Sequence, residues 1–220
     1  MTPERVFKCI SGSVAYGLNV EGSDTDMRGI FVQPLRERLS LLPGKDTDES
    51  GEGDVLFMEI KKFFMLACQG SPNVIELLWV GPENIIHKDD RLSPLFSSRD
   101  MFITEKSVKK MAGYAKGQLH LAESKKGITA TQKNKALMHA ARTAISALSM
   151  VDRRRPVVKN DGTVRDFLLR VRAGEEKFNS IYAFAMETSD RAVDAAQGLE
   201  KEVDMEKANR LFLDVLFSFY

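Results

Sequence analysis

Apolar and polar positions are spaced differently in the two halves of this chain. In the first half the apolar runs are short and end at glycine or polar clusters, which is typical of strands and short helices. These runs predict strands at 5–10, 24–32 and 54–60, a short helix or turn at 14–18, and helices at 61–69 and 71–81. From residue 104 onward apolar residues recur every three or four positions, which predicts helices at 104–123, 130–151, 163–172, 174–198 and 202–219. We therefore expect an α/β (α+β) domain with a small mixed sheet over 1–100, then an all-helical domain over 101–220 that closes a cleft.

Two polar segments separate the predicted elements. Residues 43–53 (PGKDTDESGEG) form an acidic, glycine-rich loop, and residues 152–162 (DRRRPVVKNDG) form a basic loop between two helices. Ser71 and Pro72 are residue types preferred at a helix N-cap and at the first helical position, so the helix at 71–81 is expected to begin there.

Composition narrows the class of protein. Lys and Arg number 32 against 31 Asp and Glu, so no overall field draws the chain to nucleic acid or to a membrane surface. The two cysteines, Cys9 and Cys68, lack metal-ligand spacing and are expected to be buried free thiols. The N-terminus has no signal-peptide pattern, and no stretch approaches the ~18 apolar residues of a membrane span. We expect a cytoplasmic protein with no membrane partner.

The most informative motif is an Asp-x-Asp pair, Asp24 and Asp26, at the start of the apolar strand predicted at 24–32. On a strand, residues i and i+2 point to the same face, with Cα atoms about 6–7 Å apart. Two carboxylates at that spacing can share divalent ions, and Mg²⁺ suits them because it prefers oxygen ligands and completes its shell with substrate phosphates. Mn²⁺ is the alternative ion.

A second motif, Gly12-Ser13, ends the strand predicted at 5–10. Glycine lets the backbone approach a phosphate closely, and the serine hydroxyl and nearby amides can donate hydrogen bonds to it. Either motif alone is usually a solvated turn. Together they favour attack of an acceptor hydroxyl on the α-phosphorus of a nucleoside triphosphate, with pyrophosphate leaving.

The string GSVAYGLNVEGSDTDMRGIFV resembles the DNA polymerase beta-like nucleotidyltransferase superfamily, and within it the RNA-ligase-associated, polymerase-beta-like family of bacteria and phages. The resemblance continues through EIKKF (59–63) and SPNVIELLW (71–79), where Ser71 stands in place of a common asparagine. Beyond residue 80 it is sparse, limited to Gly113-Tyr114-Ala115, Gln118 and the series Lys135, His139, Arg142. The resemblance implies transfer of a nucleoside monophosphate from ATP or another triphosphate to a hydroxyl. An RNA end in repair or modification is one acceptor; protein side chains and small molecules stay open.

The superfamily also uses a third carboxylate, on a neighbouring strand, as a metal ligand and catalytic group. Asp54 and Glu59 are the candidates, and because they are five residues apart on one predicted strand, only one can face the site. Asp54 is favoured because it opens that strand directly after a loop.

Further candidates for nucleotide or phosphate binding are Ser23, Arg28, Tyr16, Lys135, His139 and Arg142. Arg28 shares the face of the aspartates, so it meets phosphate or pairs with them. Tyr16 stacks on a base or packs in the core. Lys135, His139 and Arg142 follow a spacing of four and three, which places them on one helix face that either lines the cleft or faces solvent.

The chain has one concentrated basic region, composed of Arg153, Arg154, Arg155, Lys159, Arg165, Arg170 and Arg172. It suits the phosphate backbone of an RNA acceptor, although a solvated charged face has the same pattern. The competing class of function is a non-catalytic nucleotide- or RNA-binding module that retains the fold. The presence of both Asp24 and Asp26 favours catalysis. The sequence does not indicate the oligomeric state.

Overall fold

A computed structural model describes residues 3–42, 44–124 and 127–220. Its first half contains a five-stranded sheet with the strand order β3-β4-β2-β1-β5. The strands are β1 (Glu4–Ser11), β2 (Asp26–Val32), β3 (Thr47–Asp48), β4 (Val55–Glu59) and β5 (Ile85–Lys88). Strands β2 and β4 are parallel and the other neighbours are antiparallel, so the predicted small mixed sheet is confirmed.

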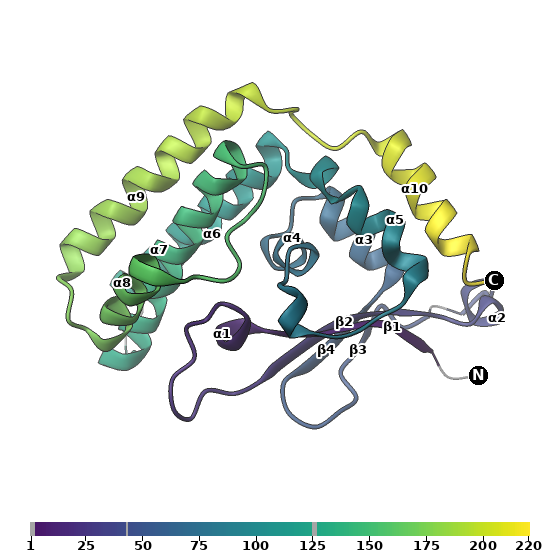
Figure 1. The fold of residues 1–220 in the computed structure, drawn as a ribbon, viewed down its shortest axis with the longest axis horizontal. Helices are drawn as coiled ribbons and strands as arrows, with labels where there is room; N and C mark the ends of the chain where they lie inside the picture. The colour runs from purple at the N-terminus through teal and green to yellow at the C-terminus, as the bar shows by residue number, and fades with distance from the viewer. Residues whose placement is uncertain (1–2, 43, 125–126) are drawn as a thin grey trace.

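Short helices accompany this sheet: α1 (Gly12–Ala15), α2 (Leu35–Arg38), α3 (Ile60–Cys68), α4 (Pro72–Leu78) and α5 (Ser93–Ser97). Helices α3, α4 and α5 lie on one side of the sheet (Figure 1). Short 3-10 helices at Pro82–Asn84, Asp90–Leu92 and Arg99–Phe102 lead from the sheet toward the second half. The apolar residues of α3 and α4 pack with those of β1 and β2 in one core, which holds these elements against the sheet.

The second half is helical, as predicted: α6 (Glu105–Ser124), α7 (Ala130–Asp152), α8 (Gly162–Ala173), α9 (Phe178–Ala195), a 3-10 turn (Ala196–Gly198) and α10 (Met205–Phe217). Helices α6 to α9 form a bundle, whereas α10 crosses back to pack on α3 and α5 (Figure 1). Core residues of the sheet half, such as Val6, belong to the same buried cluster as Met111 and Val215. This cluster therefore spans the two halves, and a second cluster, which includes Leu119, Leu137 and Leu168, fills the helical bundle.

Several predicted boundaries need correction. The strand predicted at 24–32 begins at Asp26, and the helix predicted at 174–198 begins only at Phe178. Ser71 holds the N-cap position of α4 as expected, but its side chain makes no capping hydrogen bond. Pro43, the first residue of the predicted acidic loop, lies outside the described residues.

Cys9 is a buried free thiol and Cys68 a partly buried one. Burial raises the pKa of the Cys9 thiol to about 12, so it stays protonated and unreactive. Within the described residues, no helix is both long enough and apolar enough to cross a membrane.

Candidate active site

A cavity of about 390 Å³ lies where the starts of β2 and β4 meet α1, α4 and α7. This volume is in the range of small-molecule sites. The sheet half supplies most of its wall, and the helical half adds His139 and Val158. Gly12 lines it, together with the polar residues Ser11, Tyr16, Asp26, Arg28, Thr47, Lys62, Ser71, Asn73, Glu76 and His139.

Gly12 and Asp26 are in direct contact in this cavity. The antiparallel register of β1 and β2 pairs Ser11 with Asp26, so the turn after β1 lies over the first residue of β2. Gly12 has a φ of 64°, in the left-handed region that favours glycine. A Cβ atom at this position would stand 1.7 Å from Oδ2 of Asp26. Glycine is therefore required both by the backbone conformation and by the space that the carboxylate occupies.

Asp26 and Asp54 form a carboxylate pair. The parallel register pairs Met27 with Val55, and the Met27 amide donates a 2.8 Å hydrogen bond to the Asp54 carbonyl, so the two aspartates sit side by side. Burial and a hydrogen bond shared with Asp54 raise the pKa of Asp26. Hydrogen bonds from Arg28 and with Asp26 lower the pKa of Asp54. Opposite pKa shifts are expected of two carboxylates close enough to interact, so Asp26 and Asp54 act as one unit.

Arg28 lines the cavity and pairs with Asp54. Its guanidinium lies 3.0 Å from one carboxylate oxygen of Asp54 and donates a 3.1 Å hydrogen bond to the other. It also donates to the main-chain oxygens of Met27 and Asp54 at 2.9 and 3.0 Å. Of the two roles considered from the sequence, pairing with an aspartate is the one observed, and the partner is Asp54.

Three residues predicted to act with Asp26 are not among those that line the cavity. Asp24 is exposed, two residues before β2 begins, so the same-face geometry of a strand does not apply to it. The Ser23 hydroxyl accepts a 2.9 Å hydrogen bond from the Val20 amide and closes a turn. Ser13 lies in α1, and its carbonyl accepts from the Leu18 amide at 2.9 Å. Among the residues with described positions, no group of three or more His, Cys, Asp or Glu side chains is close enough to hold a metal ion.

Glu59 is separated from the carboxylate pair by the length of β4. In the parallel register it pairs with Phe31, at the end of β2 opposite to Asp26. Its carboxylate accepts a 2.7 Å hydrogen bond from the Lys61 amide, which caps α3, and forms an ion pair with Arg38. Glu59 is buried and fully engaged there, so of the two sequence candidates only Asp54 lies beside Asp26.

Tyr16 and Arg142 belong to a buried network around Glu76. The Tyr16 hydroxyl donates a 2.7 Å hydrogen bond to one oxygen of Glu76, and Arg142 donates a 2.6 Å hydrogen bond to the other. The Arg142 guanidinium also lies 3.7 Å from the centre of the Tyr16 ring. No site role was predicted for Glu76 from the sequence. The signal was an acidic residue in the apolar run of α4, because a buried charge needs a partner.

Lys135 and His139 occupy different positions relative to the cavity. His139 lines it, and burial, then the nearby Arg142 and Lys135 charges, lower the pKa of His139 to about 3. The imidazole is therefore neutral near pH 7. Lys135 is exposed, yet its charge lowers the pKa of Asp26, so it contributes positive potential at the carboxylate pair. The predicted helix face is thus divided between cavity, solvent and core.

Comparison with known proteins identifies the family of this chain. The sequence model of the RNA repair pathway DNA polymerase beta family matches residues 4–217, so the chain belongs to that family. The family name implies a polymerase beta-like nucleotidyltransferase in RNA repair. An uncharacterized 38.9 kDa protein from the nrdC-mobD intergenic region of Enterobacteria phage T4 is 25% identical over 174 residues, which cover 73% of this chain and 48% of the phage protein. The chain thus spans about half the length of that curated relative. No solved structure matches this chain.

Proposed function

We propose that this chain is a Mg²⁺-dependent nucleotidyltransferase that moves a nucleoside monophosphate from a nucleoside triphosphate, ATP among them, to a hydroxyl of RNA. The observation that carries the proposal is the Asp26–Asp54 pair, in which Asp26 lines a cavity of about 390 Å³ together with Gly12. Family membership supports the reaction class and favours RNA as the acceptor.

Asp26 and Asp54 are the residues that would hold Mg²⁺, or Mn²⁺ in its place. They fit the ion because the two carboxylates lie side by side and share a hydrogen bond, and the Arg28 ion pair engages Asp54 rather than Asp26. Mg²⁺ is commonly bound through one or two carboxylates together with substrate phosphates. When bound, the ion would neutralise the triphosphate and lower the pKa of the attacking hydroxyl. Asp24, exposed two residues before Asp26, is the candidate for a third ligand.

The other residues position the nucleotide. Gly12 lets the Asp26 carboxylate lie directly against the turn after β1, where any larger residue would displace it, so that the backbone amides of this turn can meet a phosphate beside Asp26. The neutral His139 in the opposite wall can donate or accept a hydrogen bond without adding charge. Lys135 supplies positive potential toward the phosphates. In the reaction a bond forms between the acceptor oxygen and the α-phosphorus, and the bond to the bridging oxygen of the leaving pyrophosphate breaks.

The test is label transfer from each α-³²P-labelled triphosphate to RNA in the presence of Mg²⁺. The wild type should label RNA with at least one nucleotide, and Asp26→Asn should not. The variant should melt at the same temperature as the wild type or higher, because replacing one carboxylate removes repulsion from its neighbour. Asp24→Asn tests whether the exposed Asp24 is a third metal ligand: the variant should lose label transfer if Asp24 binds the ion and retain it if Asp24 does not. Full turnover by a folded Asp26→Asn variant would contradict the assignment of the metal site to this cavity.

A non-catalytic nucleotide- or RNA-binding module is the second candidate. It is favoured by one observation, the position of Asp24 outside the carboxylate pair. The same assay decides between the two, because a binding module would retain labelled triphosphate on a filter without passing label to RNA.

A further inference from the structure

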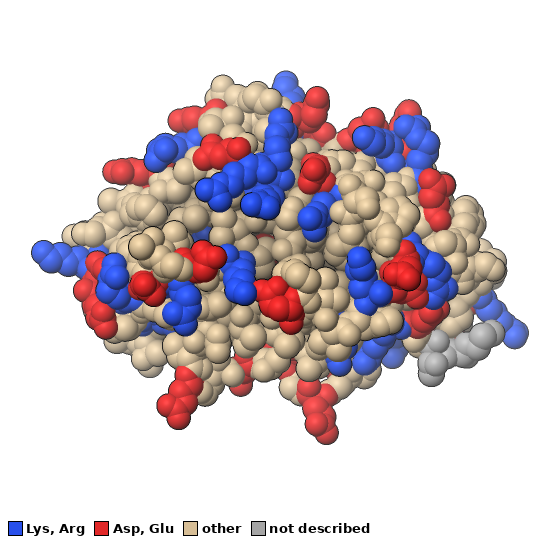
Figure 2. Space-filling view, in the orientation of Figure 1, with Lys and Arg blue, Asp and Glu red and all other residues tan. Residues whose placement is uncertain are grey.

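A second and larger cavity, of about 690 Å³, opens between α4 and the loop that joins α7 to α8. Its cationic lining residues are Arg99, Arg153, Arg155, Lys159 and Arg191, against the two acidic residues Asp152 and Asp161. In the space-filling view, Lys and Arg side chains border a hollow near the middle of the face (Figure 2). A chain with nearly balanced total charge thus concentrates positive charge around one cavity.

The structure divides the basic cluster predicted from the sequence into two groups. Arg165 and Arg172 donate to the carbonyls of Gly17 and Leu18 at 2.8 and 2.6 Å, so they hold the chain after α1. Arg170 pairs with Glu176, and Lys159 pairs with Glu83. These four side chains are committed to contacts within the protein.

Arg153 and Arg155 form the other group. Both are exposed, both line the second cavity, and within the described part of the chain neither has an ion-pair partner. Arg154 between them has a φ of 54°, unusual for a residue other than glycine, and is not part of the lining. Arg191 on α9 adds a third cation to the opposite wall.

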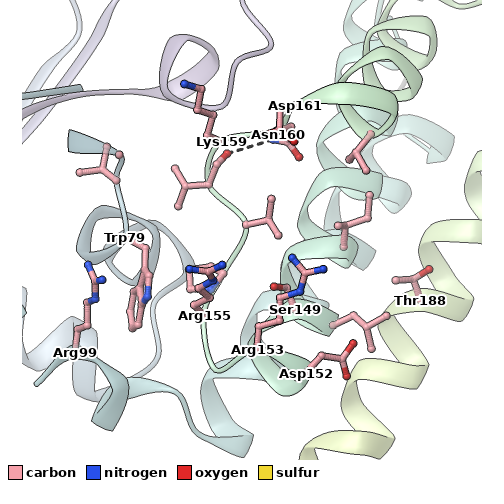
Figure 3. A pocket seen from close by; sticks show the side chains of 18 of the residues that line it. Trp79, Arg99, Ser149, Asp152, Arg153, Arg155, Lys159, Asn160, Asp161 and Thr188 are labelled. Atoms are coloured by element: carbon pink, nitrogen blue, oxygen red, sulfur yellow. Dashed lines mark hydrogen bonds between the residues drawn. The ribbon is translucent and has the colours of Figure 1, made fainter. Parts of the chain in front are cut away.

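The cavity also contains an aromatic surface. Trp79, at the end of α4, lies between Arg99 and Arg155 (Figure 3). The Arg99 guanidinium is 5.1 Å from the centre of the indole ring and donates a 2.8 Å hydrogen bond to the Leu78 carbonyl, which holds it on one face. Trp79 itself lines the cavity, with Arg155 on the side of the ring away from Arg99 (Figure 3). An indole among arginines is the combination that binds single-stranded nucleic acid, because bases stack on the ring while cations contact phosphates.

We propose that this second cavity binds a single-stranded segment of the RNA acceptor, with a base stacked on Trp79 and phosphates held by Arg153, Arg155 and Arg191. This inference rests on the proposed function for the identity of the acceptor. The two cavities share the lining residues Val80 and Val158, so a strand held in the second lies next to the Asp26 site. A duplex fits less well, because its bases are already stacked on one another.

The test is the salt dependence of binding of a short fluorescent single-stranded RNA, followed by anisotropy. Each lost phosphate contact should reduce the slope of log affinity against log salt by about 0.7. Arg153→Ala and Arg155→Ala should each show that loss, and the double variant about 1.4. Arg154→Asn is the matched control: it removes one charge from the same loop, and asparagine tolerates a positive φ. Its slope should equal that of the wild type.

A second set of variants tests the stacking surface. Trp79→Leu, once circular dichroism shows it folded, should weaken single-strand binding by roughly 5- to 150-fold with an unchanged salt slope. The wild type should bind the single strand more tightly than a duplex of the same sequence. Equal slopes for all three arginine variants and the wild type, or equal loss in Arg154→Asn, would overturn the assignment. So would equal binding of single strand and duplex.

These outcomes are separable from the fate of the proposed function. If label reaches RNA while the Arg153 and Arg155 variants bind RNA like the wild type, the second cavity is wrong and the enzyme assignment stands. If RNA binds through these arginines but no label is transferred, the cavity stands and the transferase assignment fails. Asp26→Asn should retain RNA binding, since Asp26 lies in the other cavity.

Discussion

Arg142 on α7 and Glu76 on α4, 66 positions apart in the chain, are joined by a buried 2.6 Å hydrogen-bonded ion pair. Their exposed fractions are only 3% and 5%, and the second oxygen of Glu76 is satisfied by Tyr16. The pair connects the helical half to the sheet half beside the candidate active site. It therefore fixes where α7, and with it His139, stands relative to Asp26.

Removing one partner should be costly. We expect Arg142→Met to lower the free energy of unfolding by about 3–5 kcal/mol, because Glu76 is left charged and buried without its counter-ion. Replacing both, as in Glu76→Leu with Arg142→Met, should recover much of that loss. Lys116→Ala breaks an exposed pair with Asp190, also 2.6 Å long, and is the control, with an expected loss of about 1 kcal/mol or less. Equal losses in urea denaturation of the two single variants would contradict a structural role for the buried pair.

We expect Gly12 to be required for triphosphate binding because of its contact with Asp26, and Gly22 is a control that has the same backbone conformation without that contact. Gly12 and Gly22 both have positive φ, 64° and 77°. A Cβ at Gly12 would meet Asp26, whereas one at Gly22 would have nothing within 4 Å. Alanine at either position should cost about 1–2 kcal/mol of stability from backbone strain. Only Gly12→Ala should also weaken triphosphate binding, because it displaces the Asp26 carboxylate.

The measurement is nucleotide affinity by calorimetry with Mg²⁺, on variants whose folding circular dichroism has verified. Unchanged affinity in Gly12→Ala would place the phosphates elsewhere. An equal loss of affinity in Gly22→Ala would trace the effect to general destabilisation rather than to contact with Asp26.

His139 should make the fold sensitive to acid. Burial, first of all, lowers the pKa of His139 from 6.5 to about 3, so the folded protein keeps the ring neutral while the unfolded chain takes up a proton. Its contribution to stability is therefore complete above pH 6.5 and is lost as the pH falls toward 3, by about 1.4 kcal/mol for each unit in that window. Relative to His139→Gln, the wild type should lose stability over this range. The raised pKa of Asp26 acts in the opposite direction, and both proteins retain it.

The experiment is urea denaturation at a series of pH values between 7 and 4 for wild type and His139→Gln. His120→Gln is the control for replacing an exposed histidine. Parallel profiles for the wild type and His139→Gln would mean that His139 is solvated rather than enclosed.

The hydrophobic pattern predicts the helices and the central strands because each buries a face whose spacing is local to it. The ends of helices α6 and α7 were predicted to within one residue for this reason. The start of β2 was misplaced because it depends on pairing with another strand: the Met27 amide bonds to the Asp54 carbonyl, 27 positions further on. As a result Asp26 lies at the start of β2 and lines the cavity, whereas Asp24 lies before the strand, outside the geometry that the Asp-x-Asp motif predicted.

The helix face of Lys135, His139 and Arg142 shows the same division. Their spacing on α7 was readable, but whether a given side chain meets solvent, cavity or core depends on what α4 presents to it. Glu76 binds Arg142 into the core, which no local pattern on α7 could reveal. Likewise, the sequence of three consecutive arginines does not reveal that Arg154 lies outside the cavity that Arg153 and Arg155 line.

Asp54 and Glu59 should have opposite phenotypes, which resolves the choice that the sequence left open. Asp54 is exposed at the start of β4 and lies beside Asp26, so Asp54→Asn should abolish label transfer with little change in stability. Glu59 is buried at the other end, where it caps α3 and pairs with Arg38. Glu59→Gln should retain transfer but lower the free energy of unfolding by about 1.5–3 kcal/mol, the usual contribution of a hydrogen bond to a charged group. Both variants replace a carboxylate by its amide, at opposite ends of β4, so a difference between them reports the position of the carboxylate. Loss of transfer in a folded Glu59→Gln variant, with Asp54→Asn active, would reverse the assignment of the third carboxylate.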